Sequence, residues 1–420
     1  MRDHWSSPTL SRSAVLTSLV ALALAGSIGF ALLTPPGQPY DEPAHWNNVT
    51  FYAEHGRMPV IGEPGSSYQA QMGPVYYALS AMVGSLFGAA GSEEAFHGVR
   101  LFWTLLTPVL VLLGLALARA LRASEPVAWA ATALIALNPL LLGISGSVQN
   151  DHLTITLCAL ALVLAARTQA SGRGGLAHLA IGVVIGAAVL TKVVAVSLLP
   201  AVLIAVLVRP GLVRRRWARA AAVLVGAVVT SGWWFVRNLS LYGDLTGGSA
   251  VQSAGFGFAP MPVDSVSAWV ARASEITSYL FVPVEYYRNS LRAPLPIKAL
   301  AVLSLALCGA VVGAVLVARL RGRREAGAVR VARPDLVLPV AAVASALLFY
   351  LLQSVLIFQV SIRLVFVAAP PAAVLLALAM SRLRWGAAVL VVILVTSGAA
   401  ATWLLSALPD LPEQAFMLFT

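Results

Sequence analysis

The stretch PPGQPYDEPAHWNNVTFYAEHGRMPV, residues 35–60, is a polar segment between two strongly apolar parts of the chain. It holds two adjacent carboxylates, Asp41 and Glu42, followed by His45 and several aromatic side chains. The apolar run before it, residues 13–34, is long enough to cross a bilayer, since roughly 20 helical residues span the hydrocarbon core. We therefore interpret the stretch as a loop that leaves the membrane after a first span, and its acids as candidates for a functional site.

The composition predicts an all-α membrane protein. Of the 420 residues, 59% are hydrophobic and only 11% are charged, and the mean hydropathy is +0.85. Repeated apolar runs of about 20 residues indicate transmembrane helices, because only helices and closed barrels satisfy their backbone in lipid. The net charge of +11 does not indicate nucleic-acid binding, since the basic residues lie in short loops between apolar runs. Residues 13–34 lack a clean small-residue cleavage site, so we interpret them as a retained span and not as a signal peptide.

Twelve apolar runs are candidate spans. They are residues 13–34, 73–90, 99–118, 126–147, 152–166, 175–191, 193–208, 218–236, 295–318, 335–358, 364–380 and 385–405. If residues 73–90 do not span, most basic residues fall on the cytoplasmic side and most acidic residues fall outside, as the positive-inside rule requires. We therefore predict about 11 spans, with residues 73–90 as an interfacial or re-entrant helix whose Tyr76 and Tyr77 lie near the headgroups. An ordinary second span is the alternative.

This topology predicts a single transmembrane domain, residues 1–405, in the plasma membrane, followed by a short outer tail, residues 406–420. The first outer loop, residues 35–98, contains the interfacial helix. A second long outer loop, residues 239–294, starts with a glycine-rich segment and continues with an amphipathic helical pattern. Loops of this length are usually functional or disordered, so we expect the second one to act as a lid.

The same topology gathers ionisable and aromatic side chains on the outer face. They are Asp41, Glu42, His45, Asp151, Lys192, Trp234, Arg237 and Arg363. Charges at the end of a span are costly unless they are paired or hydrated, and several on one side predict a pocket.

Each of these side chains also has a structural interpretation. The two aspartates could cap helices, Lys192 and Arg237 could be interfacial anchors, and the tryptophan pair at 233–234 could belong to an aromatic belt. Asp41 and His45 lie four residues apart and could share a divalent metal. Two ligands are too few for a metal centre, so we assign no metal site and leave metal dependence open.

Six segments, in order along the chain, resemble the GT-C superfamily of polytopic glycosyltransferases, and within it the protein O-mannosyltransferases and bacterial aminoarabinose transferases. The segments are DEPAHWNNVTFYAEHGRMP, YQAQMGPVYYALSAMVGSLFG, NPLLLGISGSVQNDHLT, GAAVLTKVVAVSLLP, GWWFVRNLSLYGD and SIRLVFVAAPPAAV, which together extend over roughly residues 35–375. The resemblance implies a GT-C-like helical bundle. The chain departs from the common pattern at Met72, Gly73 and Leu364, and its tail is too short for the soluble domain that many relatives carry.

The resemblance also implies an activity: transfer of a sugar from a polyprenyl-phosphate donor to an extracytoplasmic glycan, lipid or protein acceptor. It implies that Asp41 is the catalytic base, that Lys192 and Arg363 meet the donor phosphate, and that Asp151 serves the acceptor or a metal.

The chemistry of such a transfer fits these residue types. A hydroxyl needs a base to take its proton as it attacks, and a phosphate leaving group needs cations but no acid. One displacement inverts the anomeric carbon. We add Arg237 as a third candidate for the phosphate, and Glu42, His45, Tyr76 and Trp234 as candidates for sugar or acceptor binding. The main alternative is a transporter or flippase of lipid-linked envelope precursors, and a non-catalytic membrane scaffold is a third hypothesis.

Overall fold

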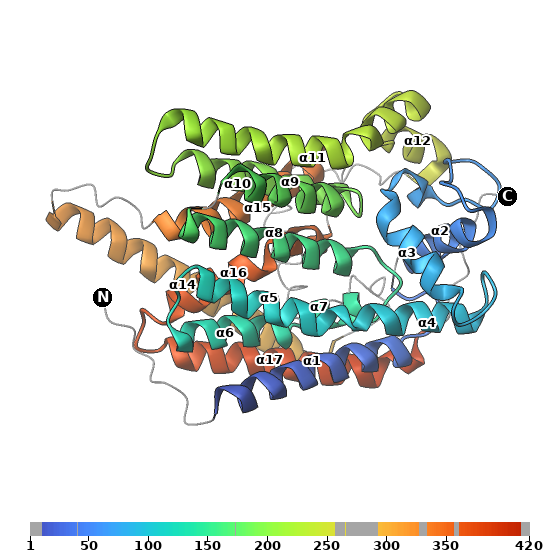
Figure 1. Cartoon of the computed structure of the whole chain (residues 1–420). Coiled ribbons are helices and arrows are strands. Elements are labelled where there is room, and N and C mark those ends of the chain that lie inside the picture. The colour runs from blue at the N-terminus through green and yellow to red at the C-terminus, as the bar shows by residue number, and fades with distance from the viewer. Residues whose placement is uncertain are drawn as a thin grey trace.

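The computed structural model describes residues 11–39, 41–172, 174–256, 265, 293–326, 334–356 and 361–412, and the regular elements within these ranges are all helices (Figure 1). In chain order they are α1 (Arg12–Leu33), α2 (Glu42–His55), η1 (Tyr68–Gln71), α3 (Pro74–Gly84), α4 (Glu93–Thr104), α5 (Leu106–Ala120), α6 (Glu125–Ala136), α7 (Pro139–Ser145), α8 (Asp151–Ser171), α9 (Gly175–Val189), η2 (Val193–Ser197), α10 (Leu198–Leu207), α11 (Val213–Tyr242), α12 (Gly248–Val251), η3 (Gln252–Phe256), α14 (Leu295–Ala326), η5 (Pro334–Leu336), α15 (Val337–Leu356), η6 (Ile362–Ala368), α16 (Ala369–Met380), α17 (Gly386–Ala407) and η7 (Leu408–Asp410). The prediction of an all-α membrane protein is confirmed.

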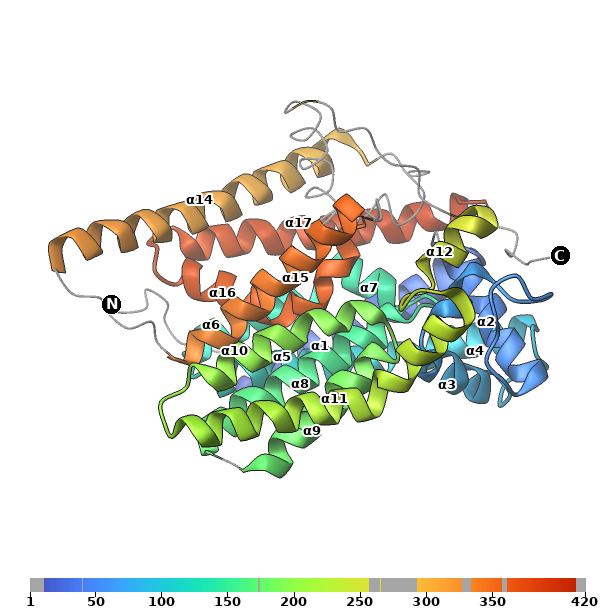
Figure 2. The ribbon, with the colours of Figure 1, turned by 90° about the horizontal axis from the view of Figure 1, so that it is seen from above.

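The long helices lie side by side in one bundle, with α2, α3 and α12 gathered at one end, which we call the short-helix end (Figure 1, Figure 2). The start of α1, the α5–α6 turn and the α10–α11 turn lie at the opposite end (Figure 1). These turns carry the basic residues that the charge pattern assigned to the cytoplasm, and Arg12 and Arg119 both contact Glu125 there. The bundle therefore separates the basic loops from the short-helix end.

Helices α9 and α11 pack closely because glycines face each other across their contact. A Cβ added to Gly182 would lie 2.1 Å from the carbonyl oxygen of Val223, and one added to Gly226 would lie 2.4 Å from that of Leu179. Small residues that let two backbones approach are the usual means of helix association in membranes, where lipid tails compete with apolar side chains.

Seven described helices are long and apolar enough to cross a membrane, and the α6–α7 pair, bent by 54°, makes an eighth if it counts as one span. Three further apolar helices are shorter, at Gly175–Val189, Val193–Leu207 and Val337–Gln353. These elements identify a multi-pass membrane protein. They correspond in position to the predicted runs other than residues 73–90, while the number of crossings stays a prediction.

The predicted interfacial segment forms α3, which has only 11 residues. At 1.5 Å per residue it rises about 17 Å, well short of the ~30 Å hydrocarbon core. It packs against α2 and α4, which favours the interfacial helix over an ordinary second span. Tyr76 and Tyr77 are fully buried in a core cluster with Trp46 and Trp103, and the predicted depth of these two residues near the headgroups stays a prediction.

Of the predicted lid, the structure describes residues 239–256, 265 and 293–294. Helix α11 extends to Tyr242, and a turn then leads into α12 and η3. The carboxylate of Asp244 orders this turn by accepting hydrogen bonds from the backbone N–H groups of Thr246, Gly247 and Ser249 at 2.7, 2.6 and 3.0 Å. The amphipathic helix expected later in the loop, and the last residues of the outer tail, lie outside the described residues.

Candidate active site

Four charged side chains form one buried network near the short-helix end. Asp41 precedes α2, Asp151 begins α8, Lys192 lies between α9 and η2, and Arg363 lies in η6. Arg363 Nη2 pairs with Asp41 Oδ2, Lys192 Nζ donates to Asp151 Oδ1 at 2.7 Å, and Arg363 Nε lies 3.9 Å from Asp151 Oδ2. All four side chains are at most 8% exposed. Two acids and two cations alternate, so the network carries no formal net charge.

Two further polar side chains complete the surroundings of this network. The Tyr68 hydroxyl donates to Asp41 Oδ1 at 2.8 Å, and Arg363 Nη1 donates to Gln149 Oε1 at 3.1 Å. Both carboxylate oxygens of Asp41 are therefore engaged. The sequence interpretation did not single out Tyr68 or Gln149. Both lie in segments that resemble the superfamily, but nothing in their immediate sequence marks them as partners of these charges.

The structure decides against the structural alternatives for the two aspartates and for Lys192. Asp41 occupies the N-cap position of α2, but its side chain makes no capping hydrogen bond. Asp151 lies in the first turn of α8 after the N-cap residue Asn150, and its carboxylate binds Lys192 instead. Lys192 is only 4% exposed, so it does not reach toward the headgroups as an anchor would.

A cavity of about 140 Å³ opens beside Asp41. Its wall comes from η1, the end of α9, α11, the α12–η3 segment and α15, and includes Trp234. Gly73 keeps this wall close to the end of α9, since a Cβ there would lie 2.0 Å from the carbonyl oxygen of Leu190. The cavity and the charged network therefore share Asp41.

Arg237 lies outside this network and anchors the first outer loop to α11. Its Nη2 donates to the carbonyl oxygen of Pro59 at 2.6 Å, and its guanidinium lies 4.6 Å from the centroid of the Trp234 ring. Trp234 Nε1 in turn donates to the carbonyl oxygen of Gln71 at 3.2 Å. These contacts give Arg237 a structural role in the absence of ligand. Its predicted contact with the donor phosphate stays a prediction.

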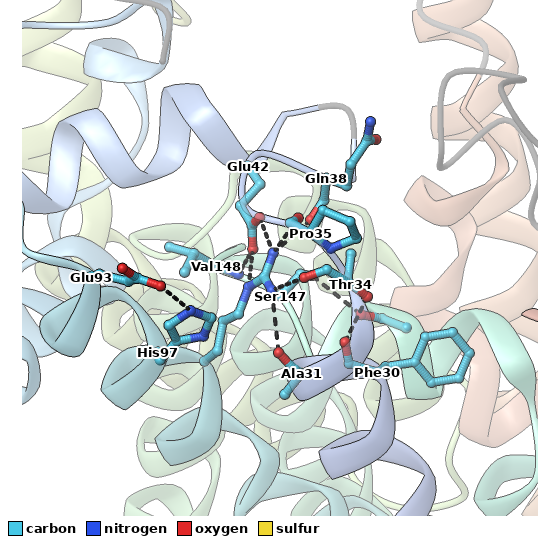
Figure 3. Close-up of polar contacts among 12 residues, drawn as sticks. Phe30, Ala31, Thr34, Pro35, Gln38, Glu42, Glu93, His97, Ser147 and Val148 are labelled. Carbon is cyan, nitrogen blue, oxygen red and sulfur yellow. Dashed lines mark hydrogen bonds and ion pairs between the residues drawn. The ribbon is translucent and has the colours of Figure 1, made fainter. Parts of the chain in front are cut away.

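Glu42 is fully enclosed and bound to Arg100 (Figure 3). Arg100 Nε donates to Glu42 Oε1 at 2.8 Å, Nη2 pairs with Oε2, and the backbone N–H of Val148 donates to Oε1 at 2.7 Å. Arg100 also donates to the carbonyl oxygens of Ala31, Thr34, Pro35 and Gln38 (Figure 3). This cluster joins the chain that leads into Asp41 to the segment that leads into Gln149 and Asp151.

His45 and Tyr76, predicted to bind sugar or acceptor, lie inside the protein on α2 and α3. His45 Nδ1 and the Tyr77 hydroxyl are hydrogen-bonded at 2.8 Å. Burial and the nearby charge of Lys192 hold the pKa of His45 well below its ordinary value, so the imidazole is neutral. Among the described residues there is no group of three or more His, Cys, Asp or Glu side chains placed to hold a metal ion.

The family model described as dolichyl-phosphate-mannose-protein mannosyltransferase matches residues 45–243, a range that contains Asp151, Lys192 and Trp234. No curated protein matches the chain significantly.

Solved structures show the same fold. One is the oligosaccharyltransferase of Archaeoglobus fulgidus in its apo form, with a TM-score of 0.56 and 16% identity over 94% of this chain and 56% of that chain. Another is ArnT of Cupriavidus metallidurans bound to undecaprenyl phosphate, with a TM-score of 0.51 and 18% identity over 89% of this chain and 61% of that chain. A third is AglB of Archaeoglobus fulgidus in complex with an inhibitory peptide and a dolichol-phosphate, with a TM-score of 0.50 and 15% identity over 95% and 56% of the two chains.

The chain spans a little over half the length of these solved structures. Their TM-scores show a shared fold, and the family model adds a matching sequence pattern over residues 45–243. The chain therefore shares the fold of these membrane proteins, and residues 45–243 match the sequence pattern of the dolichyl-phosphate-mannose-protein mannosyltransferase family.

Proposed function

We propose that this protein transfers a sugar from a polyprenyl-phosphate donor to an acceptor outside the cytoplasm, with inversion at the anomeric carbon and Asp41 as the general base. The observation that carries the proposal is the meeting of Asp41 with Arg363, Asp151 and Lys192 beside one cavity. It is supported by the solved neighbours, whose descriptions name undecaprenyl phosphate and a dolichol-phosphate as bound molecules. The acceptor class, whether glycan, lipid or protein, stays open.

In the proposed step, an acceptor hydroxyl oxygen attacks the anomeric carbon from the face opposite the phosphate. Asp41 takes the hydroxyl proton, and the electron pair of the breaking bond leaves on the phosphate oxygen. Base assistance of this kind contributes about 10²–10⁴-fold to a rate. Arg363 and Lys192 would bind the phosphate as its charge grows, in a buried site where such contacts are stronger than in water.

The pairing of Asp41 with Arg363 bears directly on this role. A carboxylate that faces a guanidinium and accepts a hydrogen bond from Tyr68 is a weak base, because both contacts stabilise its charged form. A donor phosphate would compete for Arg363, since guanidinium groups bind phosphate bidentately. Donor binding would then free Asp41 for the acceptor hydroxyl, so that the base becomes active once the donor is in place.

The test is transfer by the full-length protein in proteoliposomes loaded with a polyprenyl-phosphate sugar. Asp41→Asn should lower the transfer rate by about 10²–10⁴-fold and leave donor binding intact. Glu93→Gln is the matched control, because the Glu93 carboxylate is 80% exposed at the start of α4 and lies 3.6 Å from Nε2 of His97, four residues on. An Asp41→Asn protein that keeps wild-type transfer would remove Asp41 as the base, and movement of intact donor across the bilayer without transfer would favour the flippase alternative.

A further inference from the structure

Three glutamines on the cavity wall have side-chain oxygens without a partner. They are Gln69 and Gln71 of η1 and Gln353 of α15. Within the part of the chain that the structure describes, no hydrogen-bond donor reaches any of the three oxygens. Gln69 is only 5% exposed, so solvent does not readily supply the missing bond. A buried amide oxygen without a hydrogen bond costs free energy, and three such oxygens surround one cavity. A ligand with hydrogen-bond donors could supply the missing bonds.

The rest of the described wall is apolar or uncharged apart from Asp41. Apolar contributions include Val193 and Phe235, and Asn238 adds an amide whose Nδ2 already donates to the Gln71 carbonyl oxygen at 3.3 Å. The carboxylate of Asp41 is engaged by Arg363 and Tyr68. An anionic group placed in this cavity would find no cation among the described wall residues, which makes its burial expensive. A cationic group would pair with the carboxylate of Asp41 and so occupy the proposed base.

We propose that Gln69, Gln71 and Gln353 form a subsite that binds the hydroxyls of an uncharged sugar ring next to Asp41. A carboxamide both accepts and donates hydrogen bonds, and so does a sugar hydroxyl. The position beside Asp41 is where the reacting sugar carbon and the acceptor oxygen would have to meet. This inference rests on the proposed function and adds residues that set which sugar is accepted.

Two anchors hold η1 in place for this task. Trp234 Nε1 and Asn238 Nδ2 both donate to the carbonyl oxygen of Gln71, so α11 fixes the backbone from which two of the three amides project. Gln69 follows Tyr68, whose hydroxyl binds Asp41. The η1 segment thereby carries two of the three amides and the tyrosine that binds the proposed base.

Binding can be measured without knowing the acceptor, by native mass spectrometry of the full chain in lipid nanodiscs. The first arm compares bare polyprenyl phosphate with polyprenyl phosphate that carries a neutral hexose, an amino sugar or a uronic acid. The second arm adds the methyl glycoside of a neutral hexose to protein already loaded with bare polyprenyl phosphate. If the hexose raises the affinity above that of bare polyprenyl phosphate in the first arm, the subsite belongs to the donor sugar. If the methyl glycoside binds in the second arm, the subsite belongs to the acceptor.

Each of Gln69→Leu, Gln71→Leu and Gln353→Leu should weaken the sugar-dependent affinity by about three- to tenfold, the effect of one lost hydrogen bond. Affinity for bare polyprenyl phosphate should not change. Gln169→Leu is the matched control, because Gln169 also has an unpartnered amide nitrogen but lies near the far end of α8 from Asp151.

The inference is overturned if wild-type protein binds the amino sugar or uronic acid donor more tightly than the hexose donor. It is equally overturned if neither arm shows a sugar-dependent gain, or if all three variants behave as the control does. Failure of the proposed function would look different, because proteoliposomes loaded with a polyprenyl-phosphate sugar would then show no transfer, whatever the sugar-dependent affinity.

Discussion

Asp41 and Arg363 lie 322 positions apart in the sequence and form a buried ion pair. The pair joins the loop after the first helix to the short η6 helix near the end of the chain. Closure of the whole bundle is required to bring them together, so the candidate site exists only in the complete fold.

Removing one partner of this pair should destabilise the protein more than removing both. Arg363→Met leaves the Asp41 carboxylate buried without a cation and should lower the free energy of unfolding by about 3–5 kcal/mol. Asp41→Asn combined with Arg363→Met removes the uncompensated charge, so the double variant should be more stable than Arg363→Met alone. Denaturant unfolding in mild detergent measures both, and purely additive losses would contradict the pairing.

Lys192 should contribute to the affinity for the donor phosphate. Lys192→Met should weaken the affinity for bare polyprenyl phosphate by about 10- to 100-fold, the usual range for a lost hydrogen bond to a charged group. Lys298→Met is the matched control, because Lys298 is exposed on α14. Equal affinities of the two variants in nanodisc binding would remove Lys192 from the phosphate site.

Glu42 and Arg100 should act on the fold and not on sugar choice. Arg100→Met leaves the Glu42 carboxylate buried without a cation and removes the donor to carbonyl oxygens before α2, such as that of Gln38. We expect the free energy of unfolding to fall by about 3–5 kcal/mol. Glu42→Gln keeps the shape and should lose less. Sugar selectivity, measured as the ratio of hexose to amino-sugar donor binding, should stay at the wild-type value in Glu42→Gln. A changed ratio would support the predicted contact between Glu42 and sugar.

His45 should make the protein less stable in mild acid. Its pKa is lowered in the folded state by burial and by Lys192, so the unfolded chain binds a proton that the folded chain does not. Stability therefore falls as pH drops below the ordinary value of 6.5, with a slope of up to about 1.4 kcal/mol per pH unit from this group. His45→Gln should flatten that slope. Denaturant unfolding of both proteins at several pH values between about 5 and 6.5 measures the difference. An identical slope in both proteins would contradict the assignment.

The predicted topology can be checked by labelling. With Cys158 and Cys308 replaced by alanine, a single cysteine is introduced at Ser124 or at Arg214, in the two basic turns. An impermeant thiol reagent should reach neither site in intact cells and should label both after the membrane is opened. Labelling of either site from outside would show that residues 73–90 cross the membrane or that the orientation is reversed.

Local patterns were sufficient to predict the all-α class and the positions of the apolar helices. Hydropathy and charge are summed over neighbouring residues, and helices in lipid satisfy their own backbone, so these features do not depend on distant partners. Asp41, Asp151, Lys192 and Arg363 could also be named in advance, because charges at the ends of apolar runs are conspicuous.

Only the tertiary structure decided what each side chain contacts. Adjacent Asp41 and Glu42 look alike in the sequence, yet one borders a cavity while the other is enclosed by Arg100. Tyr68 and Gln149 gained their roles from charges that reach them across the bundle. The reason is physical: a hydropathy pattern sets where a helix lies, whereas the partner of a polar side chain depends on which helices pack together and on their rotation, and residues hundreds of positions away determine both.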